Sequence, residues 1–388
     1  MGEINQLLSD QIGQIIFLCV ILIIILTNIK KLPYFTRNCD LEHCPRIDIL
    51  IPMRNEEKNA YKCVNSLLRQ DYPNYHIFVL DDHSTDKTLS ILKELEAKSS
   101  KLTILQGSKL PQCWLGKHWA CHQLAQLSKA PFILFLDADT CAEPGLLKAA
   151  ISYALTEKTD LLTLFPREIV KTLGEKLVVP LMHWSLLSFI SFPLAFRSSS
   201  PAFTVGIGQF MLYRREAYEQ IGGFEAVRTT AVDDIEMSRL IKRDGLKWRI
   251  VNGSDYFACR MYSSFKESFN GFTRTIFAGF HYKIIPFVFV WVWLTYTFLS
   301  PLVVLALSIN LVSFPAINLI FAWVQILLSL IVWYIPFRYF EFPRYLTLLY
   351  PLIIVLALTI ALNSLISVIQ GKTRWKNRDL FKQPVSWI

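Results

Sequence analysis

The chain has 388 residues, of which 53% are hydrophobic and 13% aromatic. Its positive mean hydropathy of +0.35 excludes a purely soluble protein of this length, so part of the chain is expected to lie in lipid. The formal net charge of +9 does not indicate nucleic-acid binding, because the basic residues form no stripe interleaved with aromatic residues.

The first apolar segment lies close to the N-terminus. Residues Ile12 to Ile29 are almost continuously apolar and long enough to cross a hydrocarbon core of about 30 Å. Acidic residues precede this run and Lys30 and Lys31 follow it, which is the reverse of a signal peptide. We therefore expect residues 1–30 to be a retained transmembrane anchor, with the chain after Lys30 on the cytoplasmic side of the inner membrane.

Residues 284–371 form a second apolar region. It contains three candidate membrane helices, roughly Ile284 to Leu311, Phe314 to Ile335 and Tyr345 to Ile369. Residues 372–388 form a basic tail that suits anionic lipid headgroups. Three crossings would carry this tail to the outside, against the positive-inside rule. Either one segment is re-entrant or interfacial, which leaves two crossings, or the rule fails here.

Residues 31–283 have the pattern of an α/β domain, in which short apolar runs alternate with amphipathic stretches that begin near Asn55, Ser84 and Pro144. This spacing predicts a parallel sheet with helices on both faces, and ligands bind such sheets at the carboxyl ends of the strands. The predicted strands are Ile47 to Pro52, His76 to Asp82, Pro131 to Asp139 and Asp160 to Pro166.

Three of these strands end in polar or acidic residues. Each acid by itself could be a helix cap or a turn former. Like charges that converge on one rim are unfavourable unless a cation neutralises them, and paired carboxylates beside a diphosphate suit Mg²⁺ or Mn²⁺. The residues at the strand ends are Arg54 and Asn55, Asp81 and Asp82, and Asp137 and Asp139.

Six motifs occur in order between roughly Arg46 and Phe280: "IPMRNEE", "LDDHSTDKT", "GKHWA", "LDADT", "GGF" and "VDDIEMSRLIKRDG". As a set they resemble the membrane-attached family 2 glycosyltransferases, which implies an α/β GT-A fold with N- and C-terminal transmembrane helices. The longer "GKHWACHQL" form, the N-terminal anchor and the terminal "GKTRWKNRDL" are similar to the carotenoid- and hopanoid-associated members, of the kind that glycosylates diaponeurosporenoate.

The resemblance implies a binding site for the nucleotide of a UDP-sugar donor. Asp82 matches the acid that bonds the uracil ring, with Asp81 beside it. The segment around Pro52 and Glu56 flanks the base and ribose, and Arg54 lies in the same strand end. Lys117 matches a basic position near the diphosphate, although a solvated lysine on an amphipathic helix is the alternative.

The resemblance also implies a metal site and a catalytic base. Asp137 and Asp139 match the DXD motif, whose last acid ligates Mg²⁺ or Mn²⁺. Asp234 matches the general base of an inverting single displacement, and Asp233 replaces the customary Glu. In isolation, Asp233 and Asp234 could also be N-terminal acids favoured by a helix dipole.

Several features bear on the acceptor. The Gln-x-x-Arg-Trp motif of processive synthases is replaced by "ESFNGFTRTIFAGF", which favours a single transfer. Arg274 in this stretch could reach the donor phosphates or snorkel to headgroups. Gly206 and Gly208 would allow close backbone approach beneath the acceptor, whereas Gly222 and Gly223 could simply end a helix.

The segment Leu177 to Phe196 is apolar but contains two prolines and a His-Trp pair, so we expect it to lie in the membrane interface or to line an apolar groove rather than to cross. A lipid acceptor would explain it. The first hypothesis is transfer of a sugar, with glucose the first expectation, to a carotenoid or hopanoid. The alternatives are diacylglycerol or polyprenyl phosphate acceptors and, remotely, a non-catalytic membrane subunit. No nucleic-acid or protein partner is implied.

Overall fold

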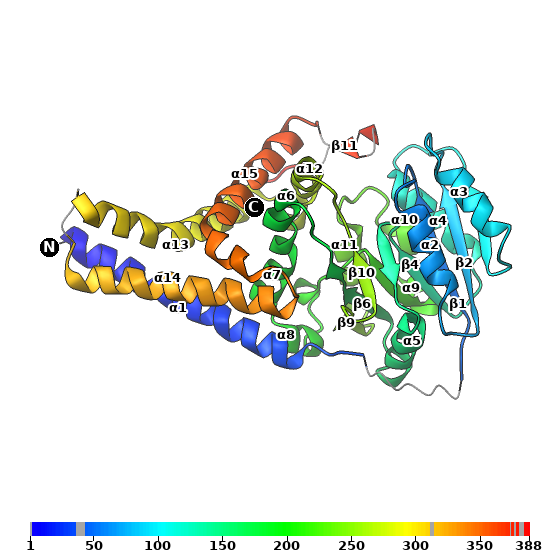
Figure 1. The fold of residues 1–388 in the computed structure, drawn as a ribbon, viewed down its shortest axis with the longest axis horizontal. Helices are drawn as coiled ribbons and strands as arrows, with labels where there is room; N and C mark the ends of the chain where they lie inside the picture. The colour runs from blue at the N-terminus through cyan, green and yellow to red at the C-terminus, as the bar shows by residue number, and fades with distance from the viewer. Residues whose placement is uncertain (1, 36–42, 311–313, 373, 376–377, 380–383) are drawn as a thin grey trace.

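The computed structural model describes residues 2–388 except for 36–42, 311–313, 373, 376–377 and 380–383, so the predicted basic tail lies partly outside the described residues. A sheet-bearing domain occupies one end of the molecule, and three long helices extend side by side away from it (Figure 1). The predicted arrangement of an α/β domain flanked by terminal apolar helices is confirmed.

The central sheet has seven strands in the order β3-β2-β1-β4-β8-β6-β9. The four predicted strands, β1, β2, β4 and β6, all run in one direction, and β3 and β9 run with them. The strands are β1 (Ile47–Met53), β2 (Tyr75–Asp81), β3 (Leu102–Gln106), β4 (Phe132–Leu136), β6 (Leu161–Phe165), β8 (Phe210–Arg214) and β9 (Trp248–Asn252).

The prediction of a wholly parallel sheet was wrong, because β8 lies antiparallel between β4 and β6. The chain stays at the carboxyl end of the sheet after β6 and enters β8 from that edge, with Phe210 opposite Leu136. A smaller sheet covers the same edge and contains β5 (Thr140–Ala142), β10 (Phe257–Cys259) and β7 (Arg167–Glu168) in that order.

Helices cover both faces of the central sheet, as predicted. Successive side chains of a strand point to opposite faces of the sheet. In β1, Leu50 packs into the hydrophobic cluster on one face, and Ile49 and Ile51 pack into the cluster on the other face. The helices of this domain are α2 (Ala60–Leu68), α3 (Thr88–Glu96), α4 (Gly116–Leu127), α5 (Leu146–Thr156), α9 (Arg215–Gln220), α10 (Gly223–Ala226), α11 (Asp233–Arg243) and α12 (Phe265–Thr275).

Three helices begin later than the sequence predicts. α2, α3 and α5 begin at Ala60, Thr88 and Leu146. Asn55 has a positive φ of 52°, so the chain turns there before the helix begins. Asn55 Oδ1 instead accepts a hydrogen bond from the Thr85 N–H at 2.8 Å, which ties the loops after β1 and β2 together.

The apolar segment Leu177 to Phe196 forms short helices rather than one span. α7 packs against both α1 and α14, and the Trp184 ring stacks on Trp333 with centroids 4.0 Å apart. Asn28 of α1 donates hydrogen bonds to the carbonyls of Leu187 and Ile190. The helices here are α6 (Leu173–Val178), α7 (Pro180–Phe189), α8 (Phe192–Arg197) and η1 (Pro201–Phe203).

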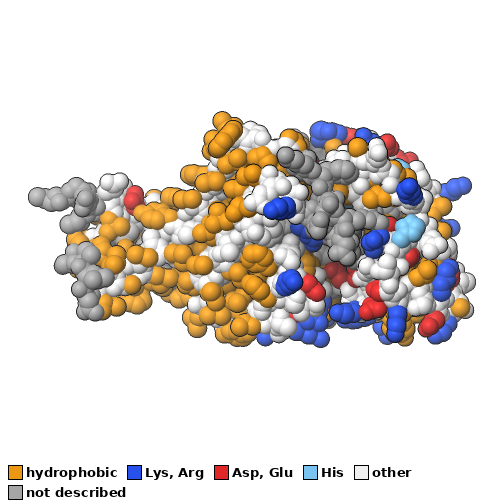
Figure 2. Space-filling view, turned by 90° about the horizontal axis from the view of Figure 1, so that it is seen from above, with side chains coloured by type: hydrophobic (Ala, Val, Ile, Leu, Met, Phe, Trp, Pro, Cys, Tyr) orange, Lys and Arg blue, Asp and Glu red, His pale blue; other side chains and the backbone are white. Residues whose placement is uncertain are grey.

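Four helices are long and apolar enough to cross a membrane. Many apolar side chains lie on the outer surface of this part of the molecule (Figure 2). Inside the bundle, polar side chains pair, as in the hydrogen bond from Asn318 to Gln11 at 3.0 Å. The elements are α1 (Gly2–Lys31), η2 (Ala278–Phe280), α13 (Ile284–Asn310), α14 (Ala316–Tyr339), η3 (Arg344–Leu349), α15 (Tyr350–Ile369), β11 (Arg374–Trp375) and β12 (Arg378–Asp379).

Candidate active site

Asp137 and Asp139 lie directly after β4, where the chain turns into β5. The Thr140 hydroxyl donates to the Asp137 carbonyl at 2.7 Å, and the Arg260 N–H donates to the Asp139 carbonyl at 3.2 Å. The backbone of this turn is therefore fixed by its neighbours. Both acidic side chains remain partly exposed at the carboxyl edge of the sheet.

These two acids fit a divalent cation. Asp139 Oδ1 is buried and has no hydrogen-bond partner among the described residues. Burial, and then the charges of Asp137 and Glu56, raise the pKa of Asp139 to about 7. No group of three or more His, Cys, Asp or Glu side chains arranged for a metal is found among the described residues. A cation would therefore need further oxygen ligands from a bound molecule, such as a diphosphate.

Lys117, in the first turn of α4, lies between two acidic pairs. Its Nζ is 2.7 Å from Asp137 Oδ1. Burial by itself lowers the pKa of Lys117, but Asp137 and Asp233 outweigh burial and raise the pKa well above its ordinary value. Lys117 is therefore a cation that links Asp137 to Asp233, rather than a solvated surface charge.

Asp233 and Asp234 begin α11. Burial raises the pKa of Asp233, but Lys117 and His118 together outweigh burial and hold the pKa below its usual range. His118 Nε2 lies 3.5 Å from Asp233 Oδ1. Sequence reasoning missed His118, although it stands next to Lys117 in the "GKHWA" motif that was singled out.

Asp234 has a different environment from its neighbour. Its Oδ2 accepts a hydrogen bond from the Gly208 N–H at 3.1 Å, and its Oδ1 accepts one from the Ile235 N–H at 2.8 Å. Burial, followed by the charge of Asp233, nevertheless raises the pKa of Asp234 to about 7. A carboxylate with such a pKa can accept a proton near neutral pH.

The predicted donor residues also converge on this edge. Arg54 Nη1 donates to the Asp82 carbonyl at 2.6 Å and lies 3.8 Å from the Asp82 carboxylate. Asp81 Oδ2 accepts a hydrogen bond from the Ser84 N–H at 3.2 Å. Pro52 pairs with Leu80 in the register of β1 and β2. Glu56 is close enough to raise the pKa of Asp137 and Asp139.

Near Asp139 lie the predicted Arg274 and two residues that sequence reasoning missed, Glu168 and Tyr262. Arg274 hydrogen-bonds to the partly buried Tyr262, and Asp139 helps to raise the pKa of that phenol, although burial contributes most. Glu168 on β7 is buried, and burial, followed by the charge of Asp139, raises its pKa well above its usual range. Arg274 therefore lies toward Asp139. Glu168 and Tyr262 lie well separated from Asp139 in the sequence and approach it only through the tertiary fold, so no local pattern could identify them.

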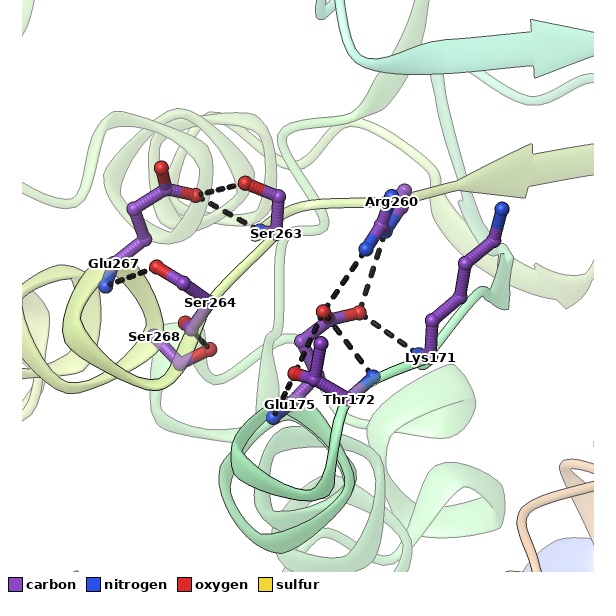
Figure 3. A network of polar contacts seen from close by, with 8 residues as sticks. All are labelled: Lys171, Thr172, Glu175, Arg260, Ser263, Ser264, Glu267 and Ser268. Carbon is purple, nitrogen blue, oxygen red and sulfur yellow. Dashed lines mark hydrogen bonds and ion pairs between the residues drawn. The ribbon is translucent and has the colours of Figure 1, made fainter.

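A polar network joins the apolar segment to this edge (Figure 3). Arg260 Nη2 lies 3.0 Å from the buried Glu175 Oε1, and the Thr172 hydroxyl and Glu175 form a capping box at the start of α6. Burial alone raises the pKa of Glu175, but Arg260 and the Lys171 N–H lower it to about 2. Because the Arg260 N–H also donates to the Asp139 carbonyl, the network fixes α6 relative to the turn that contains Asp137 and Asp139.

The family model and the curated relatives that match this chain are all glycosyltransferases. Residues 48–222 match the family described as Glycosyl transferase family 2, and the chain contains a domain of this family. Over most of the chain the fold is similar to that of a mannosyltransferase from Pyrobaculum calidifontis that was solved with GDP-mannose and Mn²⁺. The TM-score is 0.56 and the identity 14%, and the match covers 96% of this chain and 100% of that one.

Two curated relatives are similar at the level of sequence. A 4,4'-diaponeurosporenoate glycosyltransferase from Staphylococcus haemolyticus is 26% identical over 255 residues, which are 65% of this chain and 66% of that one. A beta-monoglucosyldiacylglycerol synthase from Nostoc is 29% identical over 215 residues, 53% of this chain and 42% of that one. Both matches cover less than two thirds of the relative's own length.

Proposed function

We propose that the protein is an inverting transferase that moves one sugar, glucose in the first instance, from a UDP-sugar to a membrane lipid. The proposal rests on the environment of Asp234. Its pKa is raised to about 7, and the Gly208 N–H donates a hydrogen bond to its carboxylate. Asp233, Lys117 and Asp137 lie close by. This arrangement supports a proposed base next to a candidate metal site, which suits a single displacement.

In the proposed reaction, Asp234 takes the proton from the acceptor hydroxyl while the acceptor oxygen attacks the anomeric carbon. The bond from that carbon to the nucleoside diphosphate breaks on the opposite face, which inverts the configuration. Gly208 orients the Asp234 carboxylate through its N–H. Lys117 lies beside Asp233 and Asp137, and its positive charge lowers the pKa of both acids against the effect of burial.

Asp139 and Asp137 would hold the divalent cation, and the partnerless buried oxygen of Asp139 supports that role. When bound, Mg²⁺ or Mn²⁺ supplies positive charge that stabilises the diphosphate leaving group. Asp82, with Asp81 beside it, would bind the uracil ring, and Pro52, Arg54 and Glu56 would flank the base and ribose. Arg274 approaches from α12 and would face the phosphates.

A lipid acceptor is supported by the position of the apolar segment. α7 and α8 lie against α1, and only η1 separates them from the loop of Gly206 and Gly208 that contacts Asp234. The names of the two relatives point to a carotenoid acid and to a diacylglycerol, so a carotenoid or hopanoid is the first candidate. Diacylglycerol is the second candidate, and a polyprenyl phosphate remains an alternative.

We further propose that the catalytic domain faces the cytoplasm, where UDP-sugars are made, and that the apolar helices hold it at the inner membrane. Lys30 and Lys31 at the domain end of α1 support this orientation.

The test is an assay of purified protein in detergent with Mn²⁺, a radiolabelled UDP-sugar and a total lipid extract of the source organism, with products resolved by mass. A glycosylated lipid would support the proposal, and its mass would identify the acceptor. The proposal fails if the protein binds UDP but makes no lipid product from UDP-glucose, UDP-galactose, UDP-N-acetylglucosamine or GDP-mannose.

A further inference from the structure

The C-terminal half of α15 is fixed to the catalytic domain. The Asn363 side-chain amide donates to the Thr273 hydroxyl of α12 at 3.2 Å. The N–H of Phe277, in the link between α12 and α13, donates to the buried Ser364 hydroxyl at 3.1 Å. The end of α15 therefore lies on the side of the membrane where the catalytic domain lies.

The end of the chain lies on the same side. The N–H groups of Ile284 and Ile285 donate to the carbonyls of Ser386 and Trp387 at 2.9 and 3.0 Å. Ile284 is the first residue of α13, where the chain leaves the catalytic domain. The C-terminus is thus paired with the catalytic end of a membrane helix.

The beginning of α15 lies only about halfway along α13. The ring of Tyr350 is 6.0 Å from Phe298, which is close to the midpoint of α13. Eleven residues further along α15, Ala361 packs in one cluster with Phe287, which precedes Phe298 by eleven residues. α15 therefore runs antiparallel to α13 and covers its catalytic half. Figure 1 shows α15 on the domain side of the helix bundle, near α12.

The chain also reaches the catalytic domain just before α15 begins. After α14, the Phe340 ring lies 4.6 Å from His183 of α7. In η3, the Tyr345 ring lies 6.0 Å from the Lys176 ammonium of α6. Both the segment that leads into α15 and the segment that follows it are therefore on the catalytic side.

We infer that α15 is a re-entrant helix, which dips into the leaflet on the catalytic side and returns without crossing. The chain then crosses the membrane three times, through α1, α13 and α14. The outer face of α15 would contact the acyl chains of that leaflet, since Leu352, Val355, Leu362 and Ile366 are each about half exposed. This inference does not depend on the proposed reaction.

The distribution of charge supports three crossings independently. Lys30, Lys31 and Arg338 lie at the catalytic ends of their helices. With a re-entrant α15, the described basic residues Lys372, Arg374 and Arg378 lie on the same side. The described residues at the far ends of these helices, 2–11, 310 and 314–315, include no Lys or Arg, and the sequence between 310 and 315 contains none either. Three crossings therefore satisfy the positive-inside rule, whereas a fourth would place the tail on the wrong side.

The test is thiol labelling of the full-length protein in sealed membrane vesicles with a membrane-impermeant maleimide, with labelled peptides assigned by mass spectrometry. Native Cys113 is exposed and marks the catalytic side. Three variants place a thiol at exposed positions: Gln370→Cys after α15, Ala316→Cys at the far end of α14 and Leu352→Cys in the first turn of α15.

We expect Gln370→Cys to react from the same side as Cys113, and Ala316→Cys from the opposite side. Leu352→Cys should react from neither side until detergent is added. Labelling of Gln370→Cys together with Ala316→Cys would overturn the inference, as would labelling of Leu352→Cys at the rate of Cys113. An epitope fused after Ile388 gives a second measurement without internal substitution: antibody access from the far side would also contradict a re-entrant α15.

Discussion

Gly206 lies directly against the backbone of Asp234: a β-carbon added to Gly206 would be 2.1 Å from the Asp234 carbonyl oxygen. Two residues later, the Gly208 N–H donates to the Asp234 carboxylate. The chain that leaves the apolar segment therefore ends in a loop that holds the proposed base. This contact connects the apolar segment, which packs against the membrane helices, to the proposed catalytic base Asp234.

In Gly206→Ala the added methyl group would collide with backbone atoms of Asp234. Because these atoms cannot rotate away as a flexible side chain can, we expect the start of α11 to move. Since a displacement of about 1 Å can cost about 10²-fold in rate, we expect transfer to fall by roughly that factor while UDP affinity changes little. The measurement is kcat together with UDP binding. Gly279→Ala is the matched control, because no atom lies within 4 Å of its β-carbon. A Gly206→Ala enzyme with the wild-type rate would remove this contact from the account.

The rate should depend on the ionisation of Asp234. A base acts only when deprotonated, and burial, with the charge of Asp233, raises its pKa to about 7. At saturating donor and metal, we expect kcat to fall about tenfold per pH unit below 7 and to level off above it. Asp233→Asn removes the neighbouring negative charge, so the fall in kcat should begin at a lower pH. A rate that is flat between about pH 5.5 and 8 would contradict the assignment.

Asp139→Asn should weaken metal-dependent binding of UDP. Removing a metal ligand should reduce metal affinity by at least about tenfold, so the residual UDP binding of the variant should no longer respond to EDTA. Calorimetry with and without Mn²⁺ measures this. Asp71→Asn, at an exposed position away from the site, is the control. Equal UDP affinity of the wild-type protein with and without Mn²⁺ would refute the metal assignment.

Glu175→Gln should destabilise the junction between α6 and the sheet by roughly 2 kcal/mol, the scale of lost hydrogen bonds to a charged group. The folded pKa is lowered to about 2, so the ionised Glu175 stabilises the fold above its ordinary pKa near 4.5, and this contribution is lost as pH falls from about 4.5 to 2.

The readout is the urea midpoint in detergent at pH 7. Glu267→Gln is the control, because Glu267 also caps a helix, through Ser263 and Ser264, but those hydrogen bonds are exposed. A similar decrease in the urea midpoint in the two variants would show that burial of the Glu175–Arg260 pair does not add to the stability of the fold.

The elements that the sequence predicted correctly are those that are determined by residues close together in the chain. Each of the four predicted strands is a buried run that is followed by a turn, and the acids after β2 and β4 meet at one edge because parallel strands end together. α11 was also predicted, with Asp233 at its start and Gly245 after its end. Gly245 has a φ of +74°, a conformation that favours glycine.

The rest depends on contacts between residues far apart in the chain. "FMLYR" of β8 has the composition of any buried strand, and only the path of the preceding forty residues sets its direction. His118 reaches Asp233 across more than a hundred residues. α15 has the length and hydropathy of a membrane span, and the re-entrant path inferred for it rests on its contacts with α12 and α13 and on the distribution of charge.

The most direct test of the central claim compares wild-type protein with Asp234→Asn in transfer of radiolabelled glucose from UDP-glucose to lipid, with UDP affinity measured on the same preparations. Asp244→Asn, at the other end of α11, is the control. The account predicts that the wild type and Asp244→Asn form a glycolipid, whereas Asp234→Asn loses about 10²- to 10⁴-fold in rate and keeps its UDP affinity. An Asp234→Asn enzyme that glycosylates lipid at a rate close to wild type would contradict the account.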